Sequence, residues 1–315
     1  MKFGFVILHY MAFDMTVECV EKILKLFSDN PIKIVIVDNA SFNGSGTRLR
    51  EKYQNNESVE VLINHKNLGF AQGNNIGYLY LKANYNCDFM IIMNNDVLIE
   101  QTDFLEKIQT VYEETKFAVL GPDIYSPKLK DSQSPTYRND VKNLHGLSYD
   151  SVLDINNSLH RFNSKVSYYW LRHTLFGWLR KFFPYKSSCR QSDENIVESC
   201  KVDFSKNIEG VVLHGACYIL SKNFMENRKL AFNPDTFLYF EEDILHYECK
   251  MQNLKLLYSP SLKVTHLEDV STDSVCKSSF RKTKFIKRNL EKSTNVFLSL
   301  VKENTRGRLS KNSDA

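Results

Sequence analysis

Two short apolar runs, each ending in polar residues, restrict the fold of this chain more than any other feature. Residues 34–37 are all β-branched and lead to Asp38, and residues 89–93 are all apolar and lead to Asn94. Short apolar runs without alternation are typical of strands buried on both faces of a parallel sheet. The polar residues then lie beyond the carboxyl ends of the strands, where such sheets bind ligands.

Strand-like and helix-like patterns alternate through the first 120 residues or so. The strand-like segments are residues 3–8, 32–37, 59–63, 89–93 and 117–120. Because helical spacing separates them, the sequence predicts βαβ units and an α/β fold with a mainly parallel central sheet flanked by helices. Residues 123–208 show no such pattern and are expected to be irregular. Alternation resumes at residue 210, and residues 255–258 and 262–265 are expected to be two short strands.

Composition indicates an ordinary globular protein. The 315 residues are 43% hydrophobic and 25% charged, and the net charge is +4. The seven cysteines form no C-x-x-C pair, which argues against a disulfide framework or a zinc site and favours a reducing compartment. The N-terminus lacks a signal-peptide cleavage site, and no apolar stretch approaches the roughly 18 residues of a membrane span. We therefore expect a cytoplasmic protein with at most peripheral membrane contact.

Six short motifs occur in a defined order. They are Val-Asp-Asn-Ala-Ser at 37–41, Asn-Leu-Gly-Phe-Ala-x-Gly-Asn-x-x-Gly at 67–77, Asn-Asn-Asp at 94–96, Gly-Ala-Cys at 215–217, Glu-Glu-Asp at 241–243 and Val-x-His at 264–266. This order resembles the inverting family 2 glycosyltransferases of GT-A fold, their rhamnosyltransferase-like bacterial members above all. The resemblance covers residues 3–122 and 210–270. It implies a nucleotide-diphospho-sugar donor, a divalent metal and a saccharide acceptor.

The resemblance also implies a set of donor-binding residues. They are His9, Tyr10, Asp38, Asn39, Asn67, Gly69, Asn74, Asn94 and Asn95. In this family the carboxylate at Asp38 accepts the imide N–H of uracil or thymine, although an Asx-turn is an alternative role. The Gly- and Asn-rich stretch at 67–77 opens a helix, whose N-terminus favours negative charge, but its glycines also suit close packing of a helix on the sheet.

The Asn-Asn-Asp motif occupies the metal-binding position of the family. Because the first acidic position is Asn94, Asp96 is expected to be the main protein ligand, and His266 is the expected second ligand. A divalent cation, Mn²⁺ or Mg²⁺, would neutralise the charge that builds on the departing diphosphate. An imidazole ligand favours Mn²⁺ over Mg²⁺.

The acidic run at 241–243 is the expected source of the catalytic base. An inverting transfer needs one carboxylate to take the proton of the acceptor hydroxyl. Successive helical residues point about 100° apart, so the three carboxylates cannot all face one cleft. Alignment of Leu245 with the leucine of the family's E-D-x-D-L pattern places Glu242 at the base position, with Asp243 as the second candidate. The alternative is a run of acids that stabilises a helix N-terminus.

Two basic segments indicate possible contact with a membrane. Residues 155–192 contain no Asp or Glu and hold both tryptophans of the chain among basic and aromatic residues. This composition fits an interfacial helix on an anionic bilayer, and equally a helical insertion that covers the core. The basic tail from residue 274 is either a second anchor or a polar helix that ends in disorder after residue 306.

These patterns divide the chain into a nucleotide-sugar-binding half (1–122), a variable insertion on the acceptor or membrane side (123–209), an acceptor-binding and catalytic-base half (210–270) and a basic C-terminal extension (271–315). The predicted function is transfer of a sugar from a UDP- or dTDP-sugar to a saccharide or lipid-linked saccharide acceptor, in bacterial surface polysaccharide biosynthesis at the inner face of the plasma membrane. One alternative is a non-catalytic nucleotide- or saccharide-binding protein of the same fold. A sugar nucleotidyltransferase is disfavoured because residues 9–13 lack a Gly-rich basic loop, and no motif for binding nucleic acid is present.

Overall fold

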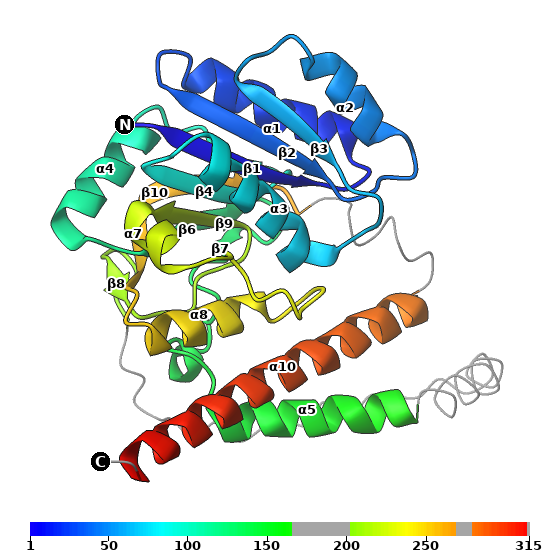
Figure 1. Cartoon of the computed structure of the whole chain (residues 1–315), viewed down its shortest axis with the longest axis vertical. Coiled ribbons are helices and arrows are strands. Elements are labelled where there is room, and N and C mark those ends of the chain that lie inside the picture. Colours follow the sequence, from blue (N-terminus) through cyan, green and yellow to red (C-terminus); the bar gives the residue numbers. More distant parts are fainter. Residues whose placement is uncertain (166–201, 269–278, 314–315) are drawn as a thin grey trace.

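The computed structural model describes residues 1–165, 202–268 and 279–313 (Figure 1). The strands are β1 (Phe3–His9), β2 (Ile32–Asp38), β3 (Val59–Ile63), β4 (Phe89–Asn94), β5 (Val97–Leu98), β6 (Val119–Ser126), β7 (Asp131–Ser132), β8 (Ile208–Glu209), β9 (Cys217–Ser221) and β10 (Leu256–His266). The helices are α1 (Phe13–Leu26), α2 (Ser45–Tyr53), α3 (Gly69–Asn84), α4 (Phe104–Thr115), α5 (Tyr149–Ser164), α7 (Lys222–Asn227), α8 (Glu241–Met251) and α10 (Ser279–Ser313), with a 3₁₀ turn at Val141–Asn143.

One mixed sheet forms the centre of the molecule. Its order is β3-β2-β1-β4-β9-β6-β10-β5, with β7 on β6 and β8 on β10. The longest ladders are parallel, and antiparallel β9 joins the two parallel parts. Register places His9 beside Asp38 and Leu8 beside Asn94, so the polar ends of β1, β2 and β4 lie at one edge. The predicted α/β fold with a mainly parallel sheet is confirmed.

Helices cover both faces of the sheet because β1 alternates its side chains between them. Phe5 and Ile7 pack with residues of α1, α2 and α4 in one core. Val6 packs on the opposite face with residues of α3, α7 and α8. The result is a three-layer arrangement, with α1 and α2 separated by the sheet from α8 (Figure 1).

Helices α5 and α10 run side by side beyond α8 (Figure 1). Val152 of α5, Ile244 of α8 and Phe297 of α10 share a third apolar cluster. The expectation that residues 123–208 are irregular was wrong for α5, which begins where the Ser148 hydroxyl accepts the N–H of Ser151 at 3.1 Å. The pattern of α5 was hard to recognise because it buries an amide, Asn156, where an apolar residue is usual.

Three other boundaries differ from expectation. Strand β6 continues through Pro122 to Ser126, which is tolerated because its ladder with β9 has already ended at Leu120. The two short strands expected near residues 255–265 form one strand, β10, with a register shift between Ser259 and Lys263. Helix α10 extends past residue 306 to Ser313. The basic segment 166–192 lies outside the described residues, and no helix within them is long and apolar enough to cross a bilayer.

Candidate active site

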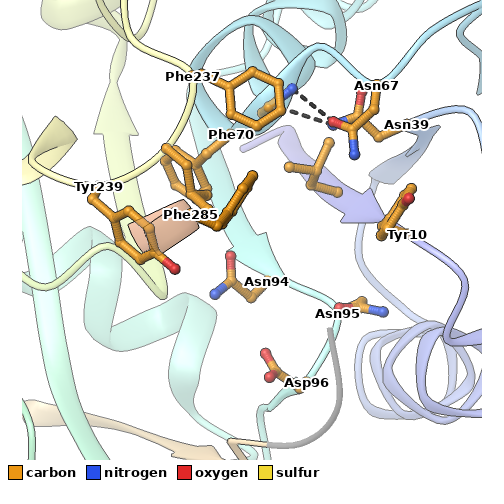
Figure 2. Close-up of a pocket in the computed structure, with 13 residues that line it drawn as sticks. Tyr10, Asn39, Asn67, Phe70, Asn94, Asn95, Asp96, Phe237, Tyr239 and Phe285 are labelled. Atoms are coloured by element: carbon orange, nitrogen blue, oxygen red, sulfur yellow. Dashed lines mark hydrogen bonds between the residues drawn. The ribbon is translucent and has the colours of Figure 1, made fainter. Parts of the chain in front are cut away.

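A cavity of about 340 Å³ lies at the carboxyl ends of β1, β2 and β4 (Figure 2). Many of the predicted donor and metal residues line it: Tyr10, Asn39, Asn67, Gly69, Asn94, Asn95 and Asp96. The rest of its lining is Leu8, Phe70, Phe237, Leu238, Tyr239 and Phe285. The motifs of the N-terminal half therefore converge on one cavity, together with aromatic residues from two distant parts of the chain.

Asn39 organises the start of helix α3 at the edge of the cavity. Its Nδ2 donates to the Gly69 carbonyl at 2.9 Å and to Asn67 Oδ1 at 3.0 Å, and its Oδ1 accepts the Leu68 N–H at 2.9 Å. Gly69 has φ +75°, and a Cβ there would lie 2.0 Å from the Phe237 carbonyl oxygen. Only glycine fits this position, so the helix start and the 237–240 loop are held in close contact.

His9, Asp38 and Asn74 do not line the cavity. The ring of His9 is fully buried, and its nitrogens pair with Thr16 Oγ1 and Ser45 Oγ at 2.7 Å each. The pKa of His9 is lowered to about 4 because burial, which lowers it, outweighs the nearby Asp38 carboxylate, which raises it. The ring is therefore neutral at pH 7. It joins β1 to α1 and α2 as a structural link.

The Asp38 carboxylate is also buried, and both of its oxygens accept the Ser41 N–H at 3.2–3.3 Å. A Cβ at residue 46 would lie 2.2 Å from Asp38 Oδ2, so Gly46 lets the start of α2 approach this carboxylate. Asn74 is buried in α3, where its Nδ2 donates to the Phe70 carbonyl at 3.0 Å and its Oδ1 has no partner among the described residues. In this arrangement Asp38 shapes the turn that carries Asn39.

Asp96 and His266 meet at the opposite edge, where β10 passes the end of β4. His266 Nε2 lies 3.3 Å from Asp96 Oδ1, a buried oxygen with no hydrogen-bond partner among the described residues. His266 Nδ1 lies 2.7 Å from Gln133 Oε1, and Gln133 Nε2 donates to Glu268. Nδ1 can therefore donate to Gln133, while Nε2 faces the carboxylate.

A carboxylate oxygen and an imidazole nitrogen that converge in this way are groups that can bind a cation, with Gln133 orienting the histidine. Across the described ranges, no cluster of three or more His, Cys, Asp or Glu side chains could hold a metal. Asp96 and His266 thus fit a divalent ion whose coordination other oxygens must complete. The ring of His214 lies 5.9 Å from that of His266.

The acidic run forms the first turn of α8, and its three carboxylates have different environments. Asp243 accepts the Tyr137 hydroxyl at 2.9 and 3.0 Å, and burial raises its pKa to about 7. Glu241 is buried, and burial together with Glu242 raises its pKa to about 8. Glu242 is the only one of the three with a partly exposed side chain. Burial raises its pKa too, while its own backbone N–H and that of Gly215 partly offset this effect.

Gly215 makes room for this carboxylate, since a Cβ there would lie 2.5 Å from Glu242 Oε1. The acidic run itself does not line the cavity, but it directly follows the loop that does. Tyr239 and Phe240 in that loop have φ of +71° and +73°, a conformation that costs free energy for non-glycine residues. Such strain is common at functional sites, where surrounding contacts hold it in place.

Four aromatic residues of the cavity were not singled out as site residues: Phe70, Phe237, Tyr239 and Phe285. Residues 237–240 were visible as an aromatic run before the acidic motif. For Phe285 the sequence carried no signal, because only tertiary packing brings α10 to the cavity.

Comparison with known proteins agrees with this geometry. A model of the family described as glycosyl transferase family 2 matches residues 5–182, more than half of the chain. The chain belongs to glycosyl transferase family 2. The family identified from the motifs is thereby confirmed, and residues 5–182 include β1 to β7 and the Asn39, Asn67 and Asp96 positions of the cavity.

The hexosyltransferase Agl10 of low-salt glycan biosynthesis in Haloferax volcanii is 26% identical over 105 residues, which are 33% of this chain and 32% of Agl10. Among solved structures, the mannosyltransferase PcManGT from Pyrobaculum calidifontis, in complex with GDP-Man and Mn²⁺, has a TM-score of 0.50 at 11% identity. That match covers 91% of this chain and 60% of PcManGT.

GalNAc-T7 with UDP, GalNAc and Mn²⁺ has a TM-score of 0.52 at 12% identity, over 86% of this chain and 44% of that one. This chain thus spans less than two thirds of the relatives it matches. The two structural likenesses show a shared GT-A architecture.

Proposed function

We propose that this protein is an inverting glycosyltransferase that moves a sugar from a nucleoside diphosphate to a saccharide acceptor. The observation that carries the proposal is the position of the cavity between two kinds of group. At one edge is Asp96, whose Oδ1 lies 3.3 Å from Nε2 of His266. The loop at the other edge leads directly to Glu242. Family membership supports this assignment.

The donor side consists of residues at the ends of β1, β2 and β4. Asp96 and His266 would hold Mn²⁺ or Mg²⁺, and oxygens of the donor diphosphate would complete the coordination. The ion would offset the negative charge that develops on the leaving diphosphate. Asn94 would bind sugar hydroxyls, as would Asn95 through its Oδ1, because its Nδ2 already donates to Thr16 Oγ1. Tyr10 and Asn39 would contact a uracil or thymine base, with Asp38 holding the turn that carries Asn39.

Mn²⁺ is the ion named with the structures of PcManGT and GalNAc-T7. Their nucleotides differ, GDP-Man in one and UDP in the other, so a likeness of fold does not choose the base. The likeness of the Val-Asp-Asn-Ala-Ser motif at 37–41 to the family supports a UDP- or dTDP-sugar in this protein.

Glu242 is the proposed catalytic base. It would take the proton of the acceptor hydroxyl as that oxygen attacks the anomeric carbon from the face opposite the diphosphate. Asp243 is less suited because its two oxygens already accept the Tyr137 hydroxyl. In this arrangement Asp243 positions α8, while Gly215 gives the Glu242 carboxylate its space.

The acceptor is proposed to be a saccharide on a lipid carrier at the inner face of the plasma membrane, in surface polysaccharide biosynthesis. This placement is supported by exposed cations that share one side of α10: Lys284, Arg288, Lys292, Lys302 and Arg306. Successive positions are four, four, ten and four residues apart, which at about 100° per residue keeps them in one stripe on one side of the helix. Residues 1–122 and 210–270 would then be the donor and acceptor halves, with the insertion 123–209 and the extension 271–315 on the membrane side.

Vesicle binding tests the membrane placement. The triple variant Lys284→Glu, Arg288→Glu and Lys292→Glu should bind vesicles of phosphatidylglycerol and phosphatidylcholine at least about tenfold more weakly than wild type, since each basic residue near such a surface contributes on the order of 1 kcal/mol. The control is a second triple variant with the same change of charge: Lys25→Glu, Lys33→Glu and Lys116→Glu. Equal binding by all three proteins would contradict a membrane role for the stripe.

A screen of nucleotide sugars tests the function itself. We expect hydrolysis or transfer with a UDP- or dTDP-sugar in the presence of Mn²⁺, and loss of turnover in excess chelator. Nucleotide binding that is independent of metal, with no turnover of any donor, would instead identify a non-catalytic binding protein.

A further inference from the structure

The cavity has two chemically different walls (Figure 2). The amides of Asn94 and Asn95 and the carboxylate of Asp96 belong to the polar wall. Phe237, Tyr239 and Phe285 belong to the aromatic wall, which Figure 2 shows across the cavity from Tyr10. A ligand that fills the space between them must present polar groups on one side and an apolar face on the other.

Helix α10 holds the aromatic wall in place. The rings of Phe285 and Phe237 pack edge to face, with centroids 6.5 Å apart and planes at 85°. The Ser293 hydroxyl donates to the Leu238 carbonyl at 3.3 Å. Phe285, Ser293 and Phe297 are spaced by eight and four residues, so they lie along one side of the helix.

Phe297 extends this support to the strained residue beside the base. Its ring packs edge to face on Phe240, 5.7 Å away and at 86°. Phe240 immediately precedes the acidic turn of α8. The C-terminal helix thus fixes the same loop that supplies Phe237 and Tyr239 to the cavity.

The charge of the cavity lining also bears on which sugar can bind. None of the lining residues in the described part of the chain is a lysine or an arginine, and the one charged side chain among them is Asp96. A sugar with its own carboxylate would meet an aromatic surface on one side and a carboxylate on the other. Removing such an anion from water without a cationic partner is strongly unfavourable.

A neutral pyranose ring suits both walls. Its hydroxyls can hydrogen-bond the amides of Asn94 and Asn95, while its C–H face can pack on aromatic rings. We propose that the donor sugar is an uncharged hexose or deoxyhexose, stacked on Phe237, Tyr239 and Phe285, with Phe285 supplied by α10 as a specificity-determining residue. This inference rests on the proposed function, because it concerns the sugar of the proposed donor.

Calorimetry of variants tests the stacking. The ligands are the donor that wild type turns over best in the screen and its free nucleoside diphosphate, both with Mn²⁺. Phe285→Ala and Phe285→Leu should bind the intact donor about tenfold more weakly, since an aromatic contact contributes on the order of 1 kcal/mol beyond its buried area. Their affinity for the diphosphate should not change. Phe285→Tyr, which keeps the ring, should bind both ligands like wild type.

Leu129→Ala is the control, because Leu129 is exposed and does not line the cavity. If the Phe285 variants bind donor and diphosphate with unchanged affinity, or lose both equally, the stacking role is wrong. In the second case the wall would bind the base and not the sugar. A loss of donor affinity in Phe285→Ala but not in Phe285→Leu would also overturn the stacking role, because apolar volume and not the aromatic ring would then determine binding.

Donor choice tests the charge selection separately. UDP-glucose and UDP-glucuronic acid, or the dTDP pair if thymidine is preferred, should differ at least tenfold in affinity, with the neutral sugar binding more tightly. A uronic acid donor that is turned over would leave the proposed function intact and overturn this inference. Absence of turnover with every donor would reject the proposed function, and this inference with it.

Discussion

The polar wall and the aromatic wall of the cavity are built in different ways. Asn94 ends β4, and Asn95 and Asp96 follow it, so they lie at the edge where the parallel strands β1, β2 and β4 end. The aromatic wall combines the 237–240 loop and α10, which are far apart in the sequence. Local chain geometry is enough to form the first wall, whereas the second depends on tertiary packing.

Because the two walls are built differently, we expect substitutions at each wall to change different properties of the protein. Changes at the polar wall and at Glu242 should affect chemistry with little change in folding. Changes at the packing behind the aromatic wall should affect stability and, through it, the site.

The largest effect is expected at Glu242. Glu242→Gln removes the proposed base, and we expect turnover to fall by about 10²–10⁴-fold, the usual contribution of general base catalysis. The turnover of Asp243→Asn should fall by less than about tenfold, because Asp243 accepts the Tyr137 hydroxyl and is not the base. Initial rates with the best donor measure both. The opposite ranking would make Asp243 the base.

The next effect concerns the metal edge. Gln133→Leu removes the acceptor for His266 Nδ1, and we expect the Mn²⁺ concentration for half-maximal activity to rise by about 10–100-fold, as for other residues that orient a metal-binding histidine. Gln101→Leu, at an amide that bonds Ser261 and Lys263 instead, is the control. An unchanged Mn²⁺ dependence in Gln133→Leu would remove His266 from the proposed metal site.

These two predictions concern the part of the molecule that the sequence described well. Apolar runs defined β1 to β4, and the motifs at their ends placed Asn39, Asn94 and Asp96. The sequence could not show that His9 has both ring nitrogens paired, since Thr16 and Ser45 reach it from separate helices. It could not place Phe285 either, because α10 has no sequence link to the cavity.

At the aromatic side, the expected effect is on stability. Phe297 is buried against Phe240 and Tyr247, so Phe297→Ala should lower the free energy of unfolding by about 3–5 kcal/mol. Phe42→Ala should change it by no more than about 0.5 kcal/mol, since Phe42 is 81% exposed. Urea unfolding measures both. Equal stability of the two variants would show that α10 does not support the fold of the 237–240 loop.

A separate effect is a pH dependence of stability from the buried acids. The raised pKa values, about 8 for Glu241 and about 7 for Asp243, mean that the folded protein binds more protons than the unfolded chain between about pH 4 and 8. Their stabilising contribution is complete at low pH and is lost as pH rises through this range. Thermal midpoints should fall from pH 5 to pH 8.5, by roughly 2–4 °C for each kcal/mol.

Glu241→Gln isolates one of these groups. Its amide cannot ionise, so the decline between pH 5 and pH 8.5 should be smaller than in wild type. Glu57→Gln, at an exposed side chain in a loop, is the control and should leave the decline unchanged. If Glu241→Gln declines as steeply as wild type, Glu241 titrates in the folded protein as it does in the unfolded chain.

The most direct test of the donor site is a crystal structure of the protein with Mn²⁺ and the nucleoside diphosphate of its preferred donor. We predict that Asp96 and His266 both contact the ion, that diphosphate oxygens complete its coordination, and that the end of the diphosphate points towards Phe237 and Glu242. A nucleotide bound outside this cavity, or an ion held without Asp96, would contradict the proposed site.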